Sequence, residues 1–109
     1  MKKKSKDPKV MAAIETATLL KAVADPDRLK IVESLRNGPK NVTELAKILR
    51  AEIVNVSHHL GVLRRRKIVS FQKRGRFVNY TLNPDIYEKS ERGDHLNLGK
   101  CRLEIPTAI

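Results

Sequence analysis

The stretch that decides the fold runs from residue 41 to residue 82 and reads NVTELAKILRAEIVNVSHHLGVLRRRKIVSFQKRGRFVNYTL. Its first part has the apolar spacing of two short helices, and its second part alternates apolar and polar residues with a period of two. Asn41 and Glu44 have the spacing of a capping box, which predicts that a helix begins here. The residues of this helix expected to point inward are Leu45, Ile48 and Leu49.

After a tight link at residues 50–52, residues 53–66 are predicted to form the next helix. At about 100° per residue, one side of this helix is apolar enough to face a core. That side carries Val56, Leu60 and Leu63, with Ile53 and His59 at its edges. The opposite side carries Val54, Ser57, His58, Gly61 and Arg65. A face of this kind, small and free of acid, can approach the major groove of a DNA duplex closely.

The alternating residues that follow predict a β-hairpin with a basic tip. If Arg74 and Gly75 form the turn, Phe71 lies opposite Val78 and Val69 lies opposite Tyr80. One face of the hairpin is then apolar on both strands. Two short helices followed directly by a hairpin predict a mainly α fold with a β-hairpin, the winged helix-turn-helix arrangement.

The positive charge is concentrated where this fold would meet DNA. The chain has 23 basic and 12 acidic residues and a net charge of +11. Four excess charges lie in the tail at residues 2–6, and no acidic residue occurs between Glu52 and Asp85. The central excess consists of Arg64, Arg65, Arg66, Lys67, Lys73, Arg74 and Arg76. Such a field attracts a polyanion, which favours nucleic acid over a merely solvated face or a membrane surface. Together with the exposed face of the helix at residues 53–66, it makes double-stranded DNA the expected partner.

The rest of the 109-residue chain is predicted to complete a single domain. Residues 10–24 predict a first helix that is apolar on more sides than one packed face needs, which favours a homodimer. Asp25 and Pro26 predict the start of a second helix, which ends near Gly38. By the same logic Asn83 predicts a last helix that ends at Gly93. The expected division is a flexible basic tail (1–9), a DNA-binding domain (10–93) and an extension of uncertain structure (94–109).

Particular segments of the chain resemble the ArsR/SmtB family of winged-helix repressors. They are LKAVADPDRLKIV (20–32), VTELA (42–46), VSHHLGVLR (56–64) and the Gly75-Arg76 turn that runs into Tyr80. The likeness covers about residues 18–83. It implies a homodimeric transcriptional repressor that binds an inverted-repeat operator and releases it when it senses an effector.

The expected DNA contacts come from the predicted reader helix and from the wing. They are Val54, Asn55, Ser57, His58, Gly61, Arg64, Arg65, Lys73, Arg74 and Arg76. The alternative is a winged-helix module that docks protein or RNA without reading a DNA sequence. No arrangement of catalytic residues is recognisable, so an enzyme is not expected. A cytoplasmic location is expected, because no secretion signal or membrane span is visible.

The chain departs from the metal-sensing members of the family it resembles. Where arsenic, cadmium and lead sensors carry a Cys-x-Cys pair, it has Ala46 and Ile48. Asp94, His95 and Cys101 are the only clustered potential ligands, and their spacing matches no known set, so neither a metal nor another cofactor is predicted. Glu52 and Ile53 stand where the family commonly has a capping Ser and a base-reading Gln.

The single cysteine allows two interpretations. Cys101 lies between Lys100 and Arg102, and nearby positive charge favours the reactive thiolate, which would suit a redox sensor. Cys101 also alternates with Leu103 and Ile105, as a packed structural residue does.

Overall fold

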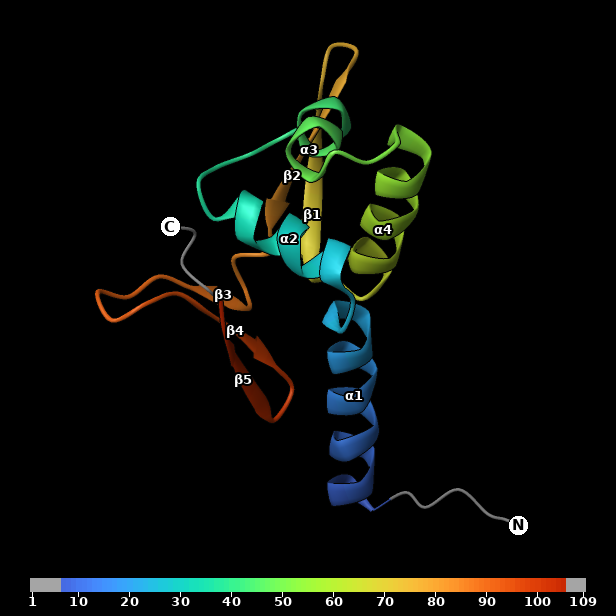
Figure 1. The fold of residues 1–109 in the computed structure, drawn as a ribbon. Helices are drawn as coiled ribbons and strands as arrows, with labels where there is room; N and C mark the ends of the chain where they lie inside the picture. Colours follow the sequence, from blue (N-terminus) through green and yellow to red (C-terminus); the bar gives the residue numbers. More distant parts are fainter. Residues whose placement is uncertain (1–6, 106–109) are drawn as a thin grey trace.

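A computed structural model describes residues 7–105 as four helices followed by five strands (Figure 1). The helices are α1 (Pro8–Val23), α2 (Pro26–Leu35), α3 (Val42–Leu49) and α4 (Ile53–Arg65). The strands are β1 (Val69–Arg74), β2 (Phe77–Leu82), β3 (Tyr87–Glu88), β4 (His95–Leu98) and β5 (Cys101–Glu104). Within residues 7–105, no helix is both long and apolar enough to cross a membrane.

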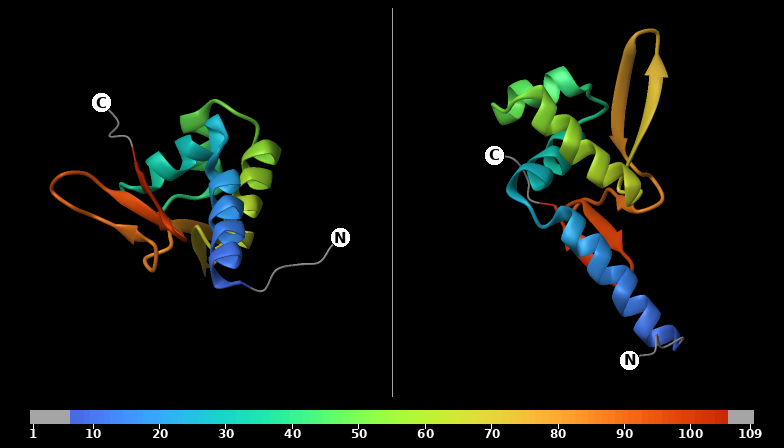
Figure 2. Two further views of the ribbon diagram at one scale, coloured as in Figure 1. Left: turned by 90° about the horizontal axis from the view of Figure 1, so that it is seen from below. Right: turned by 90° about the vertical axis from the view of Figure 1, so that its right-hand side faces the viewer.

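The elements divide between two ends of the molecule. The tip of the β1–β2 hairpin, α3 and the start of α4 lie at one end, whereas α1 and the strands β3–β5 lie at the other (Figure 1; Figure 2, right). The hairpin is the wing of the fold. Main-chain hydrogen bonds in both directions between Lys40 and Tyr80 join it to the segment before α3.

The helix starts follow the capping residues that the sequence predicts. The Asp25 side chain accepts hydrogen bonds from two main-chain N–H groups of α2, and Asn41 and Glu44 form the capping box of α3. The first helix begins at Pro8 rather than Val10, because the Asp7 side chain caps it by accepting from the N–H of Lys9. The boundary expected after residue 9 is therefore wrong, because the helix already begins at Pro8. Residues 1–6 of the expected tail lie outside the described part of the chain.

One hydrophobic core joins the four helices to both sheets. Its members with the largest fully buried side chains are Ile31, Leu45, Leu60, Leu63, Ile68, Leu96, Leu98, Val32, Val56 and Val69. The apolar side of α4 is therefore buried as predicted. The inward orientation predicted for Ile48 is wrong, because its side chain is 47% exposed. The buried residues of α3 are Leu45 and Ala46, and Leu49 packs partly buried against the core, as predicted.

The register predicted for the wing is wrong by two residues. Phe71 pairs with Tyr80, and Val69 pairs with Leu82, because the two-residue turn is Gly75-Arg76 rather than Arg74-Gly75. The first position of such a turn favours glycine, and Gly75 has a φ of 61° there. A shift of two keeps every side chain on its predicted face, so Phe71 and Tyr80 still share the apolar side.

The helix predicted from Asn83 to Gly93 does not form. The Asn83 side chain accepts from the N–H of Asp85, and the Asn83 carbonyl accepts from Ile86 and Tyr87, which gives a single turn. Few apolar residues follow, so a longer helix would have no stripe to bury. Instead Tyr87 pairs with Leu96 in a three-stranded sheet of order β3-β4-β5.

The C-terminal residues without a predicted structure form the hairpin β4–β5. Its two-residue turn, Gly99-Lys100, lies against α1, where the N–H of Lys100 donates to the Thr16 hydroxyl over 2.8 Å. The pairing of β3 with β4 crosses the domain boundary expected at residue 93. Residues 106–109 lie outside the described part.

Candidate nucleic-acid interface

The exposed face of α4 holds the residues expected to read DNA. The Val54 side chain is 77% exposed, and Asn55, Ser57 and His58 are exposed beside it. All four lie in the first two turns of α4, while Gly61 in the next turn is half-buried. A Cβ added at Gly61 would meet only the Arg65 side chain, at an ordinary contact distance of 3.4 Å. The helix therefore presents a small, acid-free surface along its first half.

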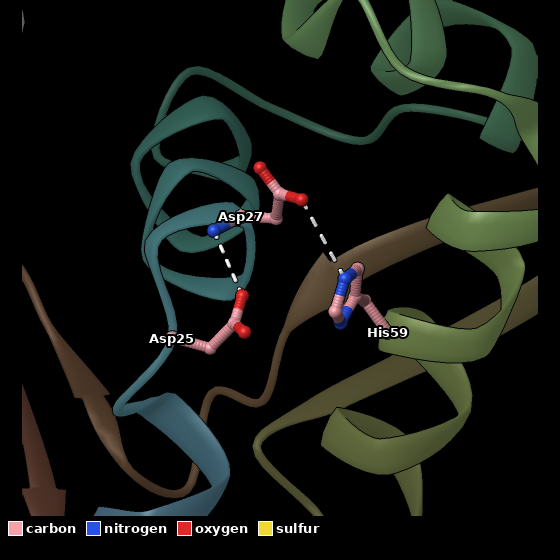
Figure 3. A group of neighbouring side chains, drawn as sticks. All are labelled: Asp25, Asp27 and His59. Carbon is pink, nitrogen blue, oxygen red and sulfur yellow. Dashed lines mark hydrogen bonds and ion pairs between the residues drawn. The ribbon is translucent and has the colours of Figure 1, made fainter.

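A polar cluster beneath this face holds α4 against the start of α2. An Arg28 guanidinium nitrogen lies 3.0 Å from His59 Nδ1. On the other side of the ring, Asp27 Oδ2 lies 3.6 Å from His59 Nε2, as Figure 3 shows. Since arginine can only donate, His59 Nδ1 must accept and the ring proton of the neutral form belongs on Nε2, facing Asp27. Arg28 also donates to the carbonyl of Ala22. These contacts fix the orientation of α4, and with it the exposed reading face.

The same cluster is the only group of three potential metal ligands within residues 7–105: Asp25, Asp27 and His59. Its chemistry does not favour a metal. Asp25 is engaged as the cap of α2, and the main-chain N–H groups of Arg28 and Asp27 hold the pKa of its carboxyl below the usual value. The guanidinium of Arg28 lies directly against the imidazole and would repel a cation. Hydrogen bonds engage the side chains of Asp25 and His59, and Asp27 Oδ2 contacts His59 Nε2 over 3.6 Å.

The potential ligands noted near the C-terminus are not brought together as such a group. Asp94 Oδ2 accepts from the Tyr87 hydroxyl over 2.6 Å and from Arg36 Nε over 2.9 Å. The pKa of Asp94 is lowered, chiefly by the hydrogen bond from Tyr87 and then by Arg36. Burial, followed by the hydrogen bond to Asp94, raises the pKa of Tyr87 to about 12. His95 contacts Arg102 and Glu88 instead.

The basic residues continue from the end of α4 onto the wing. The guanidinium carbon of Arg64 lies 5.1 Å from the centre of the Phe71 ring, over its face. Phe71 in turn packs against Tyr80, with ring centres 6.0 Å apart. This cation–π contact places Arg64 between α4 and β1 while it remains exposed.

The wing tip carries its own positive group. Lys73, Arg74 and Arg76 are exposed around the Gly75 turn. Sequence reasoning missed Phe77, whose side chain is 56% exposed although it pairs with Arg74 next to the turn. An exposed phenylalanine at a basic hairpin tip could have been noticed from the alternation alone. The tip therefore combines cationic and apolar groups.

The two surfaces lie at one end of the molecule, since α4 begins beside α3 and the wing rises next to both (Figure 1). The whole central excess of charge, from Arg64 to Arg76, is exposed. At the start of α4, Glu52 is the N-cap residue, but its side chain makes no capping hydrogen bond. This geometry is that of a winged helix-turn-helix DNA-binding protein.

Comparison with known proteins identifies the family. Residues 25–70 match the family described as bacterial regulatory protein, arsR family. The chain is 40% identical over 93 residues to the HTH-type transcriptional regulator NmtR of Mycobacterium tuberculosis, covering 81% of this chain and 78% of that one. It is 31% identical over 72 residues to the transcriptional repressor SdpR of Bacillus subtilis, covering 66% and 80%.

A solved structure shows the same fold. The homodimeric winged helix-turn-helix DNA-binding domain Mb0332 from Mycobacterium bovis superimposes with a TM-score of 0.68 at 25% identity, over 78% of both chains. The present chain belongs to the arsR family of bacterial regulatory proteins and is a DNA-binding transcriptional regulator. The family resemblance predicted from its sequence is confirmed.

Proposed function

We propose that the chain is a transcriptional repressor that acts in the cytoplasm as a homodimer on an inverted-repeat operator. In this proposal Val54, Asn55, Ser57 and His58 contact base edges in the major groove, with Gly61 allowing close approach. Arg64 and Arg65 contact phosphates beside the groove, and Lys73, Arg74 and Arg76 of the wing hold the neighbouring backbone or minor groove.

The observation that carries the proposal is the continuity of the two surfaces. The acid-free face of α4 is joined to the basic wing through Arg64, which lies over the Phe71 ring. A docking module for protein or RNA needs no such match between a narrow helix face and a basic hairpin. The repressor role is supported by the similarity to SdpR, which is a transcriptional repressor.

The homodimer is supported by the exposed apolar residues of α1. The side chains of Val10, Met11 and Ile14 are 41%, 54% and 57% exposed, on the half of α1 that projects from the molecule (Figure 1; Figure 2). A second copy would cover them. Two-fold symmetry would then place two α4 helices about one DNA turn, ~34 Å, apart.

The deciding experiment is selection of bound sequences from a random duplex pool with purified protein at near-physiological salt. The expected result is an enriched inverted repeat with half-sites spaced by about one helical turn. A pool without enrichment would mean that the chain does not read sequence, and would favour the docking alternative. An enriched site without a repeat would remove the dimeric arrangement.

Two variants assign the roles of the helix and the wing. His58→Ala should change which bases are preferred at one position, whereas Arg76→Ala should weaken all duplexes about equally. Arg92→Ala is the matched control, since it removes the same charge from the exposed loop between β3 and β4. Equal effects of His58→Ala on all duplexes would mean that His58 does not contact a base.

A further inference from the structure

The strand β5 leaves one edge of the C-terminal sheet unpaired. Because the sheet order is β3-β4-β5, β5 has a neighbour on one side only. Edge strands expose main-chain donors and acceptors that can pair with another chain, and proteins usually protect them with like charges, proline or bulges. The four residues of β5, Cys101–Glu104, contain no proline, and the two charges among them, Arg102 and Glu104, are of opposite sign.

The hydrogen-bond pattern shows which main-chain groups face outward. The N–H of Ile105 donates to the carbonyl of Asp94, so this pair is hydrogen-bonded. In an antiparallel ladder such pairs alternate, so Leu103 pairs with Leu96 in the same way. The N–H and C=O groups of the alternate residues, Arg102 and Glu104, therefore point to the free edge. Within residues 7–105, no hydrogen bond is made to these main-chain groups.

The geometry points to a second copy of this chain as the occupant of that edge, with the two β5 strands pairing antiparallel about a two-fold axis at Leu103. In this register Arg102 of one protomer lies opposite Glu104 of its partner, and the same pair recurs on the other side of the axis. The outward main-chain groups of both residues then form four hydrogen bonds. The two three-stranded sheets become one continuous six-stranded sheet.

Charge complementarity selects this occupant. An antiparallel copy matches each arginine to a glutamate and places Leu103 against its symmetry mate, so the strand is complementary to itself. The Glu104 side chain has no ion-pair partner within residues 7–105 and is exposed, so it is free to meet Arg102 of a second copy. The wing strands offer a contrasting edge, because their exposed Lys73 and Arg74 would repel a second wing.

This inference rests on the homodimer of the proposed function, and the position of β5 in the fold is compatible with that homodimer. The Gly99-Lys100 turn that begins β5 is bound to the middle of α1 through Thr16. The sheet and the exposed apolar half of α1 thus lie together at the end of the molecule remote from the wing tip (Figure 1). One partner could cover both surfaces.

The first test is reversal of charge. Glu104→Arg places arginine opposite arginine twice in the dimer, and should raise the dimer dissociation constant roughly ten-fold in sedimentation equilibrium. Arg102→Glu should have a similar effect, although this residue also contacts His95 of its own chain. The double variant Arg102→Glu with Glu104→Arg restores the match and should restore the dimer. Circular dichroism of each variant checks that it folds.

The second test is a cross-link at the axis. Leu103→Cys, combined with Cys101→Ser, would place two thiols across a non-hydrogen-bonded pair with Cα atoms ~4.5 Å apart, within the range of a disulfide. It should give a covalent dimer on mild oxidation. The unmodified chain is the control, because the two Cys101 residues would lie four positions apart along the strands, roughly 13 Å, too far to bridge.

The outcomes separate this inference from the proposed function. Rescue by the double variant together with a cross-link at residue 103 supports the β5 pairing. A stable dimer that neither responds to charge reversal nor cross-links at residue 103 overturns the pairing and leaves the homodimer intact. A monomer at micromolar concentration overturns both. Cross-linking of the unmodified chain within its dimer would show a different register.

Discussion

The two hairpins of this chain have similar backbone geometry, but their side chains lie in different surroundings. Both β1–β2 and β4–β5 are antiparallel, and both turns begin with a glycine, Gly75 or Gly99, at a φ of 61°. The wing is exposed along most of β1, whereas three of the four residues of β4 are buried. The same local structure therefore serves an open basic surface in one place and a core in the other.

The difference predicts that binding and stability depend on separate hairpins. Only Val69 at the start of the wing and Leu82 at its end are buried, so the tip contributes little to the core. The C-terminal hairpin contributes Leu96 and Leu98, which are fully buried. Substitutions at the wing tip should change DNA affinity at constant stability, and substitutions in β4 should do the opposite.

The largest expected effect is on DNA binding through the wing. Affinity of the native protein should fall ~10³ to 10⁵-fold between about 50 and about 200 mM salt, since six to ten phosphates would be neutralised by a dimer. The triple variant Lys73→Gln, Arg74→Gln and Arg76→Gln should bind weakly and lower the salt slope by about one for each lost phosphate contact.

Fluorescence anisotropy with one duplex across a salt series measures both quantities. The melting temperature of the triple variant should match that of the native protein, because the three side chains are exposed. An unchanged salt slope would contradict the role of the wing in binding phosphate.

The next largest effect should be on the free energy of unfolding, through the C-terminal hairpin β4–β5. Leu96→Ala removes a fully buried side chain from β4 and should lower the free energy of unfolding by ~2–5 kcal/mol. Val78→Ala removes a half-buried side chain from the wing and should cost less, about 1 kcal/mol. Urea denaturation of both variants compares them, and equal losses would show that the wing is as much part of the core as β4.

A smaller effect is expected where the C-terminal sheet joins α2. Asp94→Asn keeps the shape of a buried side chain but removes the charge that accepts from Tyr87 and Arg36, and should cost ~1–3 kcal/mol at neutral pH. The folded-state pKa of Asp94 is lowered, so its contribution is present above the unfolded value near ~4 and is lost as pH falls through the folded value.

Urea titrations at a series of acidic pH values test this link. At neutral pH the Asp94→Asn variant already lacks the stabilisation that the native protein loses when Asp94 is protonated. The plots of unfolding free energy against pH for the two proteins should therefore converge at low pH. Parallel curves would mean that Asp94 does not titrate with folding.

The contrast between the two hairpins also explains which parts of the fold were predictable. The caps at Asp25 and Asn41, the buried side of α4 and the faces of the wing follow from local rules of spacing, and all were predicted. The wing register was missed by two residues because alternation fixes the face and not the partner. The turn glycine decides the partner, and Gly75 could have been placed first in the turn from its sequence alone.

The C-terminal sheet was not predictable in the same way. Tyr87 and Glu88 form a strand only because β4 lies beside them, and Asn83 with Pro84 gives the local signal of a helix start. The burial of Asp94 depends on Arg36, which is 58 positions away. For the candidate interface, local patterns placed the exposed residues of α4, whereas the contact of Arg64 with Phe71 needed the packing of α4 against β1. The role of each residue at DNA stays a prediction.

The smallest effect concerns the hydroxyl of Tyr87. Tyr87→Phe removes the donor to Asp94 and should cost about 1 kcal/mol at neutral pH. In the native protein the pKa of Tyr87 rises from 10.0 to about 12, so the folded state keeps a proton that the unfolded state releases between these values. Its stabilising contribution is therefore complete below pH ~10 and is lost as pH rises toward ~12.

Urea denaturation between about pH 8 and pH 11 tests this prediction. The unfolding free energy of Tyr87→Phe should fall less steeply with rising pH than that of the native protein. Tyr80→Phe is the matched control, since it removes a tyrosine hydroxyl from the wing instead of the C-terminal sheet. If the native protein and Tyr87→Phe lose stability at the same rate, the folded state does not hold the Tyr87 proton at a pH where the unfolded state releases it.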